Sequence, residues 1–221
     1  MEGVSVCMSV YGFSEYLPAQ IESIIAQSTT IDEIVVVEDF SGLVSPADYL
    51  NEIFSANNIR LVYLKLSMNV GPAEAFRLAI SASTGDVIYL CDHDDIWVET
   101  KIYNSIKKLN SVENNNKASL YMSGYKLIDE YDKIIGYPEQ KKILSFQNSL
   151  LENISPGHTF VFNNKAKELF NSCSSEMISH DWSMLQIVHG TSGNLINDEF
   201  FGSLYRQHNN NLIGYKRGKV D

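Results

Sequence analysis

Largely apolar runs alternate with amphipathic segments through the first half of the chain. The apolar runs predict four β-strands, at residues 4–10, 33–37, 59–66 and 87–91. The segments between them predict helices over 15–27, from the Ser45-Pro46 pair onward with Ser45 as the cap, and from Pro72 to about Gly85. Strands separated by helices predict an α/β fold with a mostly parallel, twisted central sheet and helices on both faces.

The second half of the chain is less regular. Its pattern predicts helices over 100–109, 165–170 and 183–188, and strands over 120–127, 160–162 and 200–205. Polar residues predict turns at 114–116 and 129–133, and the second turn leads into Ile134-Ile135 as a hairpin. No internal repeat or low-complexity linker divides the sequence. We therefore expect a single domain over 1–221, in which residues from about 111 onward pack onto the first half.

Composition narrows the class of protein. The chain has 221 residues, 44% of them hydrophobic, so it can bury a core without disulfides or structural metals. The net charge of −10 argues against a non-specific nucleic-acid binder, because phosphate affinity comes from clustered Lys and Arg. The one basic cluster is Lys216, Arg217 and Lys219, which predicts a solvated tail. The alternative is that this tail makes weak peripheral contact with anionic lipid.

Cysteine usage and hydropathy indicate the compartment. The three cysteines are far apart, and Cys7 and Cys91 lie inside apolar runs, which predicts buried free thiols in a reducing environment. No segment approaches the about 20 apolar residues that span a bilayer. Met1-Glu2-Gly3 lacks the basic start and apolar stretch of a signal peptide. We expect a cytoplasmic protein, with the inner face of the membrane as a further option.

Polar clusters follow three of the predicted strands, at 11–14, 38–41 and 92–95. Ligands bind beyond the carboxyl ends of such strands, where these clusters come together. Asp92, Asp94 and Asp95 repel one another and lose solvation at the end of a buried strand. A bound cation such as Mg²⁺ or Mn²⁺ would offset that unfavourable free energy. A one-residue gap directs Asp92 and Asp94 to the same side if the strand continues. The alternative is an acidic helix start, in which Asp94 and Asp95 favour the dipole of a following helix.

Four motifs occupy the strand ends in turn: Ser9-Val10-Tyr11, Val37-Glu38-Asp39-Phe40-Ser41, Asn69-Val70-Gly71-Pro72-Ala73 followed by Arg77, and Asp92-His93-Asp94-Asp95. In this order and spacing, over about residues 4–105, they resemble family 2 of the glycosyltransferases. That resemblance implies a GT-A-type three-layer sandwich and an inverting, metal-dependent sugar transfer. It also implies that about 1–110 bind the nucleotide-sugar and about 111–221 bind the acceptor and hold the catalytic base. Glu38 and Phe40 depart from the Asp and Gly that the family commonly has there.

The second half adds further motifs of the same kind. They are Ser155-Pro156-Gly157-His158-Thr159, Ser179-His180-Asp181-Trp182 and Tyr205-Arg206-Gln207-His208. Together with Asp95-Ile96-Trp97 they resemble the bacterial branch of rhamnosyltransferase-like enzymes of surface-polysaccharide assembly. Relatives often continue further beyond the last of these motifs, so a membrane-associating or acceptor-binding tail is not expected here.

The resemblance implies a role for each matched residue. Asp181 is the implied general base, which takes the acceptor proton; a helix cap is the alternative role for this residue. The implied donor-binding residues are Ser9, Tyr11, Asp39, Asn69, Arg77, Asp92 and His93. The implied ligands of Mn²⁺ or Mg²⁺ are Asp94, Asp92 and His208. The implied acceptor-binding residues are Trp97, His158, Thr159 and Trp182.

Several of these residues also have plainer explanations. Core packing suits both tryptophans, a structural role at a strand end suits His208, and an ion pair on the helix surface suits Arg77. His93 takes no metal-ligand role, because adjacent residues in a strand point to opposite faces.

The expected function is transfer of a sugar from a nucleotide-diphosphate sugar, dTDP-rhamnose or a UDP-hexose, to a hydroxyl of a saccharide or lipid-linked saccharide. The pathway implied is bacterial surface polysaccharide or lipopolysaccharide assembly. A sugar nucleotidyltransferase is disfavoured, because the loop after the first strand, 10–15, has one glycine and no cation to hold a triphosphate. No G-x-G-x-x-G follows a strand, which disfavours a dinucleotide enzyme. A catalytically inactive nucleotide-sugar binding module of the same fold stays open.

Overall fold

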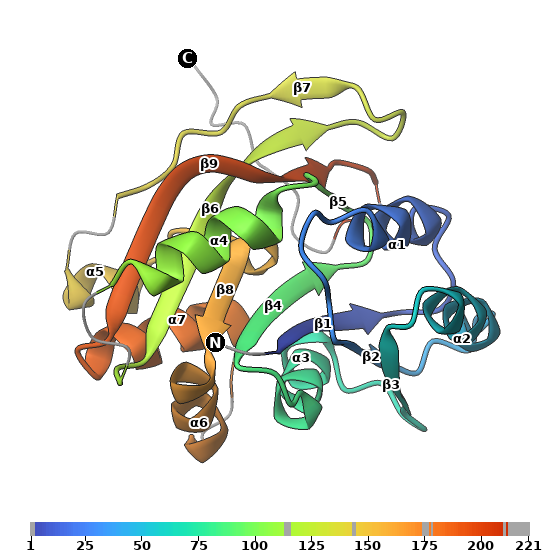
Figure 1. Cartoon of the computed structure of the whole chain (residues 1–221), viewed down its shortest axis with the longest axis horizontal. Coiled ribbons are helices and arrows are strands. Elements are labelled where there is room, and N and C mark those ends of the chain that lie inside the picture. The colour runs from blue at the N-terminus through green and yellow to red at the C-terminus, as the bar shows by residue number, and fades with distance from the viewer. Residues whose placement is uncertain are drawn as a thin grey trace.

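A computed structural model describes residues 3–112, 116–142, 145–173, 177, 179–209 and 211. Its centre is a nine-stranded sheet with the order β3-β2-β1-β4-β8-β6-β9-β5, to which β7 adds by pairing with β6 (Figure 1). The first four strands pair in parallel, as their apolar runs predict. They are β1 (Val4–Val10), β2 (Glu33–Glu38), β3 (Arg60–Lys65) and β4 (Val87–Asp92).

The second half of the sheet is mixed. β8 pairs antiparallel with both β4 and β6, whereas the long strands β6 and β9 pair in parallel. The predicted α/β fold with helices on both faces is confirmed; parallel pairing covers the first half and the β6–β9 pair, and the antiparallel pairs are those of β5, β7 and β8. The strands involved are β5 (Ile96–Trp97), β6 (Ser119–Ile128), β7 (Ile134–Gly136), β8 (Phe160–Asn163) and β9 (Asn194–Arg206).

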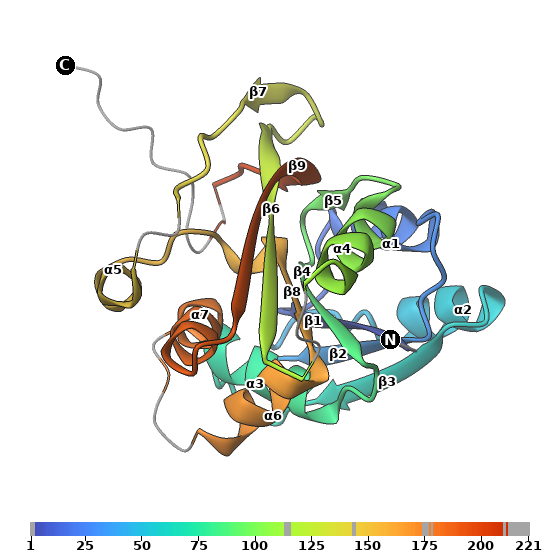
Figure 2. The same cartoon turned by 60° about the vertical axis from the view of Figure 1, so that its left-hand side comes forward.

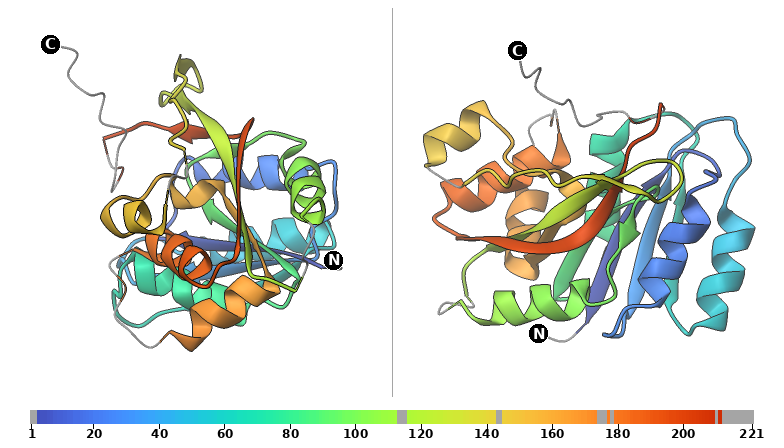
Figure 3. Two further views of the ribbon diagram at one scale, coloured as in Figure 1. Left: turned by 90° about the vertical axis from the view of Figure 1, so that its left-hand side faces the viewer. Right: turned by 90° about the horizontal axis from the view of Figure 1, so that it is seen from above.

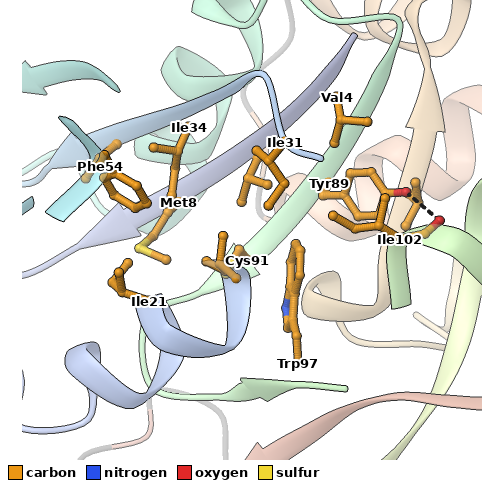
Figure 4. Packing of buried hydrophobic residues seen from close by; sticks show 14 of the residues in the cluster. Val4, Met8, Ile21, Ile31, Ile34, Phe54, Tyr89, Cys91, Trp97 and Ile102 are labelled. Carbon is orange, nitrogen blue, oxygen red and sulfur yellow. Dashed lines mark hydrogen bonds between the residues drawn. The ribbon is translucent and has the colours of Figure 1, made fainter. Parts of the chain in front are cut away.

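Three helices cover one face of the sheet: α1 (Leu17–Ile25), α2 (Ala47–Ala56) and α4 (Lys101–Asn110). Their apolar stripes meet the side chains of β1, β2 and β4 that point to this face. Figure 4 shows this core, where Ile21 and Phe54 approach Met8 of β1. Trp97 lies in the same cluster, so its ring is part of the core.

The opposite face packs against α3 (Pro72–Ala82), α6 (Asn164–Ser172) and α7 (His180–Gly190). Side chains of the other parity, such as Cys7 and Val35, form this second core. The three layers are seen in the turned views of Figures 2 and 3. The short helix α5 (Phe146–Leu151) packs against α7, and the 3₁₀ turn η1 (Gly157–Thr159) leads into β8.

Element boundaries differ from the predictions where side chains find tertiary partners. α2 begins at Ala47 with Pro46 as N-cap, one residue later than expected, and the Ser45 hydroxyl donates to Glu38 at 2.7 Å. α3 ends at Ala82, because Ser83 is extended. The sequence pattern missed α5 and β5, and it predicted only the last part of β9. The predicted hairpin at Ile134-Ile135 is confirmed as β7.

Free thiols are confirmed for Cys7 and Cys91, and both are buried. No helix among the described residues is long and apolar enough to cross a membrane. The basic cluster Lys216, Arg217 and Lys219 lies outside the described residues, as do Asn114 and Asn115 of one predicted turn.

Candidate active site

The carboxyl ends of β1, β2 and β4 lie side by side at the middle of the sheet. β1 pairs with β2 on one side and β4 on the other, and Ser9 is the register partner of both Val37 and Asp92. The strand order switches at β1, because β2 and β3 lie on one side of it and β4 on the other. In α/β sheets, ligands bind beyond the carboxyl ends of the strands at such a switch point. The expectation that the three polar clusters meet at one edge is therefore confirmed. Tyr11, just beyond β1, is 52% exposed at this edge.

Three carboxylates, Asp92, Asp94 and Asp95, lie at the end of β4 at this edge. Asp92 is the last strand residue, and the chain turns at His93 and Asp94, so the strand does not continue as the same-side argument required. Burial, then the Asp94 and Asp181 carboxylates, raise the pKa of Asp92 to about 7. Asp181, on α7, is near enough for its charge to contribute to that shift.

Asp95 is fully buried beneath this surface. Its Oδ1 accepts a hydrogen bond from the Arg206 backbone N–H at 3.0 Å, and its Oδ2 lies 3.3 Å from Nδ1 of His158. Burial, followed by the Asp92 and Asp94 charges, raises the pKa of Asp95. The carboxylates at this edge therefore repel one another when all are ionised, and a bound cation would offset that repulsion.

His208 reaches the same place from the end of β9. Its Nε2 lies 2.9 Å from Oδ2 of Asp94, and its ring packs on Tyr16 with centroids 4.8 Å apart. This pair could supply one oxygen and one nitrogen ligand atom to a cation. Among the described residues, no three His, Cys, Asp or Glu side chains converge into a complete metal site. The donor set suits an ion that takes its remaining ligands from phosphate and water, as Mg²⁺ does.

Asp181 is the second residue of α7, and both of its carboxylate oxygens accept hydrogen bonds. Oδ1 accepts from the Trp182 backbone N–H at 2.7 Å and from the Ser179 hydroxyl. Oδ2 accepts from Nδ2 of Asn153 at 2.9 Å. The N-cap of α7 is Ser179, so Asp181 is not the helix cap that the alternative role required. Its role as general base stays a prediction.

Asp39 is 4% exposed at the end of β2. Its oxygens accept backbone N–H donors from Phe40 at 3.0 Å, Val70 at 2.9 Å and Gly71 at 2.9 Å. The carboxylate therefore organises the loop that carries Asn69, in which Gly71 has a φ of 79°. Its direct contact with a nucleotide base stays a prediction.

Other predicted residues are buried or already paired with a neighbour. Arg77 pairs with Glu74 on the surface of α3. His158 and Thr159 are buried, and burial lowers the pKa of His158. Trp97 is 2% exposed. Because a buried side chain offers no surface to an acceptor, direct acceptor contact by His158, Thr159 and Trp97 is not compatible with this structure. Trp182 is partly buried, and its indole donates to the Ser149 carbonyl at 2.5 Å.

Sequence reasoning missed two buried cations behind the acids. Lys101 donates to the His158 carbonyl at 2.7 Å and lies 4.2 Å from the Trp97 ring centre. Burial lowers the pKa of Lys101 to about 8. Arg206 is 1% exposed, donates from Nε to the Asp94 carbonyl at 2.8 Å, and pairs with Asp132. Arg206 belongs to the motif Tyr205-Arg206-Gln207-His208, but the spacing of that motif does not indicate that the arginine side chain is buried.

A family model for glycosyl transferase family 2 matches residues 5–170. The chain belongs to glycosyl transferase family 2. Among curated relatives of the family, it is 30% identical over 142 residues to an uncharacterized glycosyltransferase of Rickettsia felis, covering 64% of this chain and 22% of that protein. It is 32% identical over 106 residues to the Escherichia coli UDP-Glc:alpha-D-GlcNAc-diphosphoundecaprenol beta-1,3-glucosyltransferase WfaP, covering 48% of this chain and 41% of that protein.

Solved structures share the GT-A fold of this family 2 chain. The S. aureus TarS 1-349 structure in complex with UDP-GlcNAc superposes with a TM-score of 0.71 at 14% identity, covering 95% of this chain and 60% of that one. The TarS 1-349 complex with UDP gives 0.71 at 15% identity, covering 93% and 61%. At these identities the likeness concerns the fold. The chain spans 22% to 61% of the lengths of the relatives named here.

Proposed function

We propose that this family 2 glycosyltransferase is an inverting, metal-dependent enzyme that transfers a sugar from a nucleotide-diphosphate sugar to an acceptor hydroxyl. The observation that carries the proposal is the convergence of Asp94, His208, Asp92 and Asp181 at one edge of the sheet. These residues come from three distant parts of the chain. They provide ligand atoms for a cation next to an aimed carboxylate.

Asp94 and His208 would hold Mn²⁺ or Mg²⁺, with Asp92 in the metal shell or on the ribose. Carboxylate oxygen suits both ions, and imidazole nitrogen suits the transition metal better, so the pair favours Mn²⁺. When bound, the ion supplies Lewis-acid stabilisation of the charge that develops on the diphosphate, worth several kcal/mol.

Asp181 acts on the acceptor side. The acceptor hydroxyl oxygen forms a bond to the anomeric carbon while the bond from that carbon to the diphosphate oxygen breaks. The hydroxyl proton passes to the Asp181 carboxylate, and the nucleoside diphosphate leaves with the bonding electron pair. Direct displacement on the face opposite the leaving group inverts the anomeric configuration. A positioned base of this kind contributes about 10²–10⁴-fold.

The donor we favour is a UDP-hexose, ahead of dTDP-rhamnose. The name of the WfaP relative gives UDP-Glc as its donor, and the TarS neighbour was solved with UDP-GlcNAc and with UDP. The same WfaP name gives a sugar-diphosphoundecaprenol acceptor, which supports a saccharide or lipid-linked saccharide acceptor here. Assembly of bacterial surface polysaccharide or lipopolysaccharide is the pathway that these chemistries fit.

The test separates the two acids. UDP affinity is measured by calorimetry with Mn²⁺ and with EDTA, in the wild type, Asp94→Asn and Asp181→Asn, and UDP-sugar turnover is measured in parallel. Asp94→Asn should remove the metal-dependent part of UDP affinity. Asp181→Asn should keep UDP affinity and lower turnover by about 10²-fold or more, because the amide lacks a basic lone pair.

Three outcomes contradict the proposal. Equal UDP affinity in EDTA and Mn²⁺ removes the metal, and a retained anomeric configuration in the product, read by NMR coupling, removes Asp181 as a single-displacement base. Tight UDP-sugar binding with no turnover on any donor or acceptor tried identifies an inactive binding module.

A further inference from the structure

The Asp181 carboxylate receives its donors from two directions. The Trp182 N–H and the Ser179 hydroxyl lie on the same chain segment as Asp181, and both bond Oδ1. Oδ2 receives one hydrogen bond, at 2.9 Å, from the side chain of Asn153, which is 28 positions earlier. Local contacts at the helix start therefore fix one oxygen, and the direction of the other oxygen depends on a different segment.

We propose that Asn153 is a positioning residue, which holds Oδ2 of Asp181 in the orientation that accepts the proton of the acceptor hydroxyl. This inference rests on the proposed role of Asp181 as the base. A carboxylate oxygen has two lone pairs. Because Asn153 occupies one lone pair of Oδ2, the second points in a fixed direction. Oδ1 already accepts two donors, so Oδ2 is the oxygen left to act on the acceptor.

The orientation of the Asn153 amide follows from its partner. A carboxylate accepts hydrogen bonds and donates none, so the NH₂ group of the amide must face Oδ2. The opposite atom, Asn153 Oδ1, is buried and has no hydrogen-bond partner in the part of the chain that the structure describes. A buried oxygen without a partner costs free energy. The contact with Asp181 is what explains an amide at this position.

The segment that carries Asn153 is docked on α7 by other contacts. The Ser149 carbonyl of α5 accepts from Nε1 of Trp182 at 2.5 Å and from Nε2 of Gln186 at 3.2 Å. On the other side, a Cβ at Gly157 would lie 2.9 Å from Nε2 of His180 and 3.2 Å from Cβ of Asp181. The absence of a side chain at Gly157 thus lets η1 approach the start of α7. Replacing Asn153 leaves this docking in place.

The experiment compares Asn153→Leu with Gln186→Leu. Both substitutions replace an amide by an apolar group of similar size, and both remove one hydrogen bond between α7 and the α5–η1 segment, but only the first touches Asp181. Asn153→Leu should lower kcat about tenfold and leave the donor KM and the UDP Kd within about twofold of wild type. Gln186→Leu should keep kcat near wild type. If Asn153→Leu lowers the melting temperature more than the control does, Asn153→Ala gives the same comparison without added bulk.

Two results overturn the inference. One is wild-type kcat in Asn153→Leu, and the other is an equal loss of kcat in both leucine variants. Asp181→Asn separates this failure from failure of the proposed function: if Asp181→Asn keeps its turnover, Asp181 is not the base, whatever Asn153 does. If Asp181→Asn is impaired as expected, Asn153→Leu should cause no further loss in that background, because the two residues act through one oxygen.

Discussion

Nε2 of His208 lies 2.9 Å from Oδ2 of Asp94, although 114 positions separate the two residues. The contact joins the end of the last strand, β9, to the turn after β4. Arg206, two residues before His208, reinforces the junction by donating to the Asp94 carbonyl. The edge of the sheet that carries the acids is therefore closed by residues from the end of the described chain, and the two candidate ligand atoms are already neighbours.

His208→Leu should weaken Mn²⁺ binding in the presence of UDP by at least about tenfold, because one ligand atom is lost and Asp94 loses its oriented partner. Titration of Mn²⁺ followed by electron paramagnetic resonance measures this directly. His189→Leu, the same change near the C-terminal end of α7, is the matched control and should bind Mn²⁺ as the wild type does. Equal affinity in the two variants would assign His208 a structural role only.

Asp39→Asn should lower the free energy of unfolding by about 1–3 kcal/mol, since an amide nitrogen would face backbone N–H groups that now bond a carboxylate. UDP affinity should fall as well, because the loop with Asn69 loses its anchor. Urea unfolding and UDP calorimetry measure the two effects. Asp48→Asn, an exposed acid on α2, serves as the control. Unchanged stability with lost UDP affinity would instead favour direct contact between Asp39 and the base.

The raised pKa of Asp92, about 7 against an ordinary value of 3.8, predicts a pH effect on the metal-free protein. Between about pH 4 and 7 the folded state keeps a proton that the unfolded state releases, so the contribution of Asp92 to the unfolding free energy falls as pH rises. Urea unfolding in EDTA should give a wild-type minus Asp92→Asn difference that decreases across this range. Groups that do not interact with Asp92 titrate alike in both proteins and cancel. A difference that stays flat with pH would show that Asp92 ionises normally.

Gly157→Ala should push η1 from the start of α7, because the added methyl group would meet His180 and Asp181 at less than normal contact distances. We expect a stability loss of about 1–3 kcal/mol and a drop in turnover with little change in UDP affinity. Gly136→Ala, whose methyl group would meet only the flexible end of Leu127 at 3.3 Å, is the control. Wild-type turnover in Gly157→Ala would mean that the segment moves without disturbing Asp181.

The sequence pattern was sufficient to predict the first half of the fold, because each helix and strand there has its own periodic set of buried apolar side chains. The run at β1 is apolar on both parities, since Val6 and Met8 face one helix layer and Cys7 the other. Parallel pairing then brings the strand ends to one edge. The placement of Asp92 beside Ser9, and so the location of the site, follows from this logic without any knowledge of long-range contacts.

The sequence by itself also determined the family and the candidate acids, through motifs whose order matches the strands. Tertiary structure alone decided which side chains meet. Burial of Trp97, His158 and Arg206, and the contacts of Asn153 with Asp181 and of His208 with Asp94, depend on how α5, α7 and β9 pack on the first half. Local periodicity reports which face of an element is apolar, but it carries no information on the partner that covers that face. A polar residue therefore looks alike in sequence whether it lies at the surface or satisfies a buried neighbour.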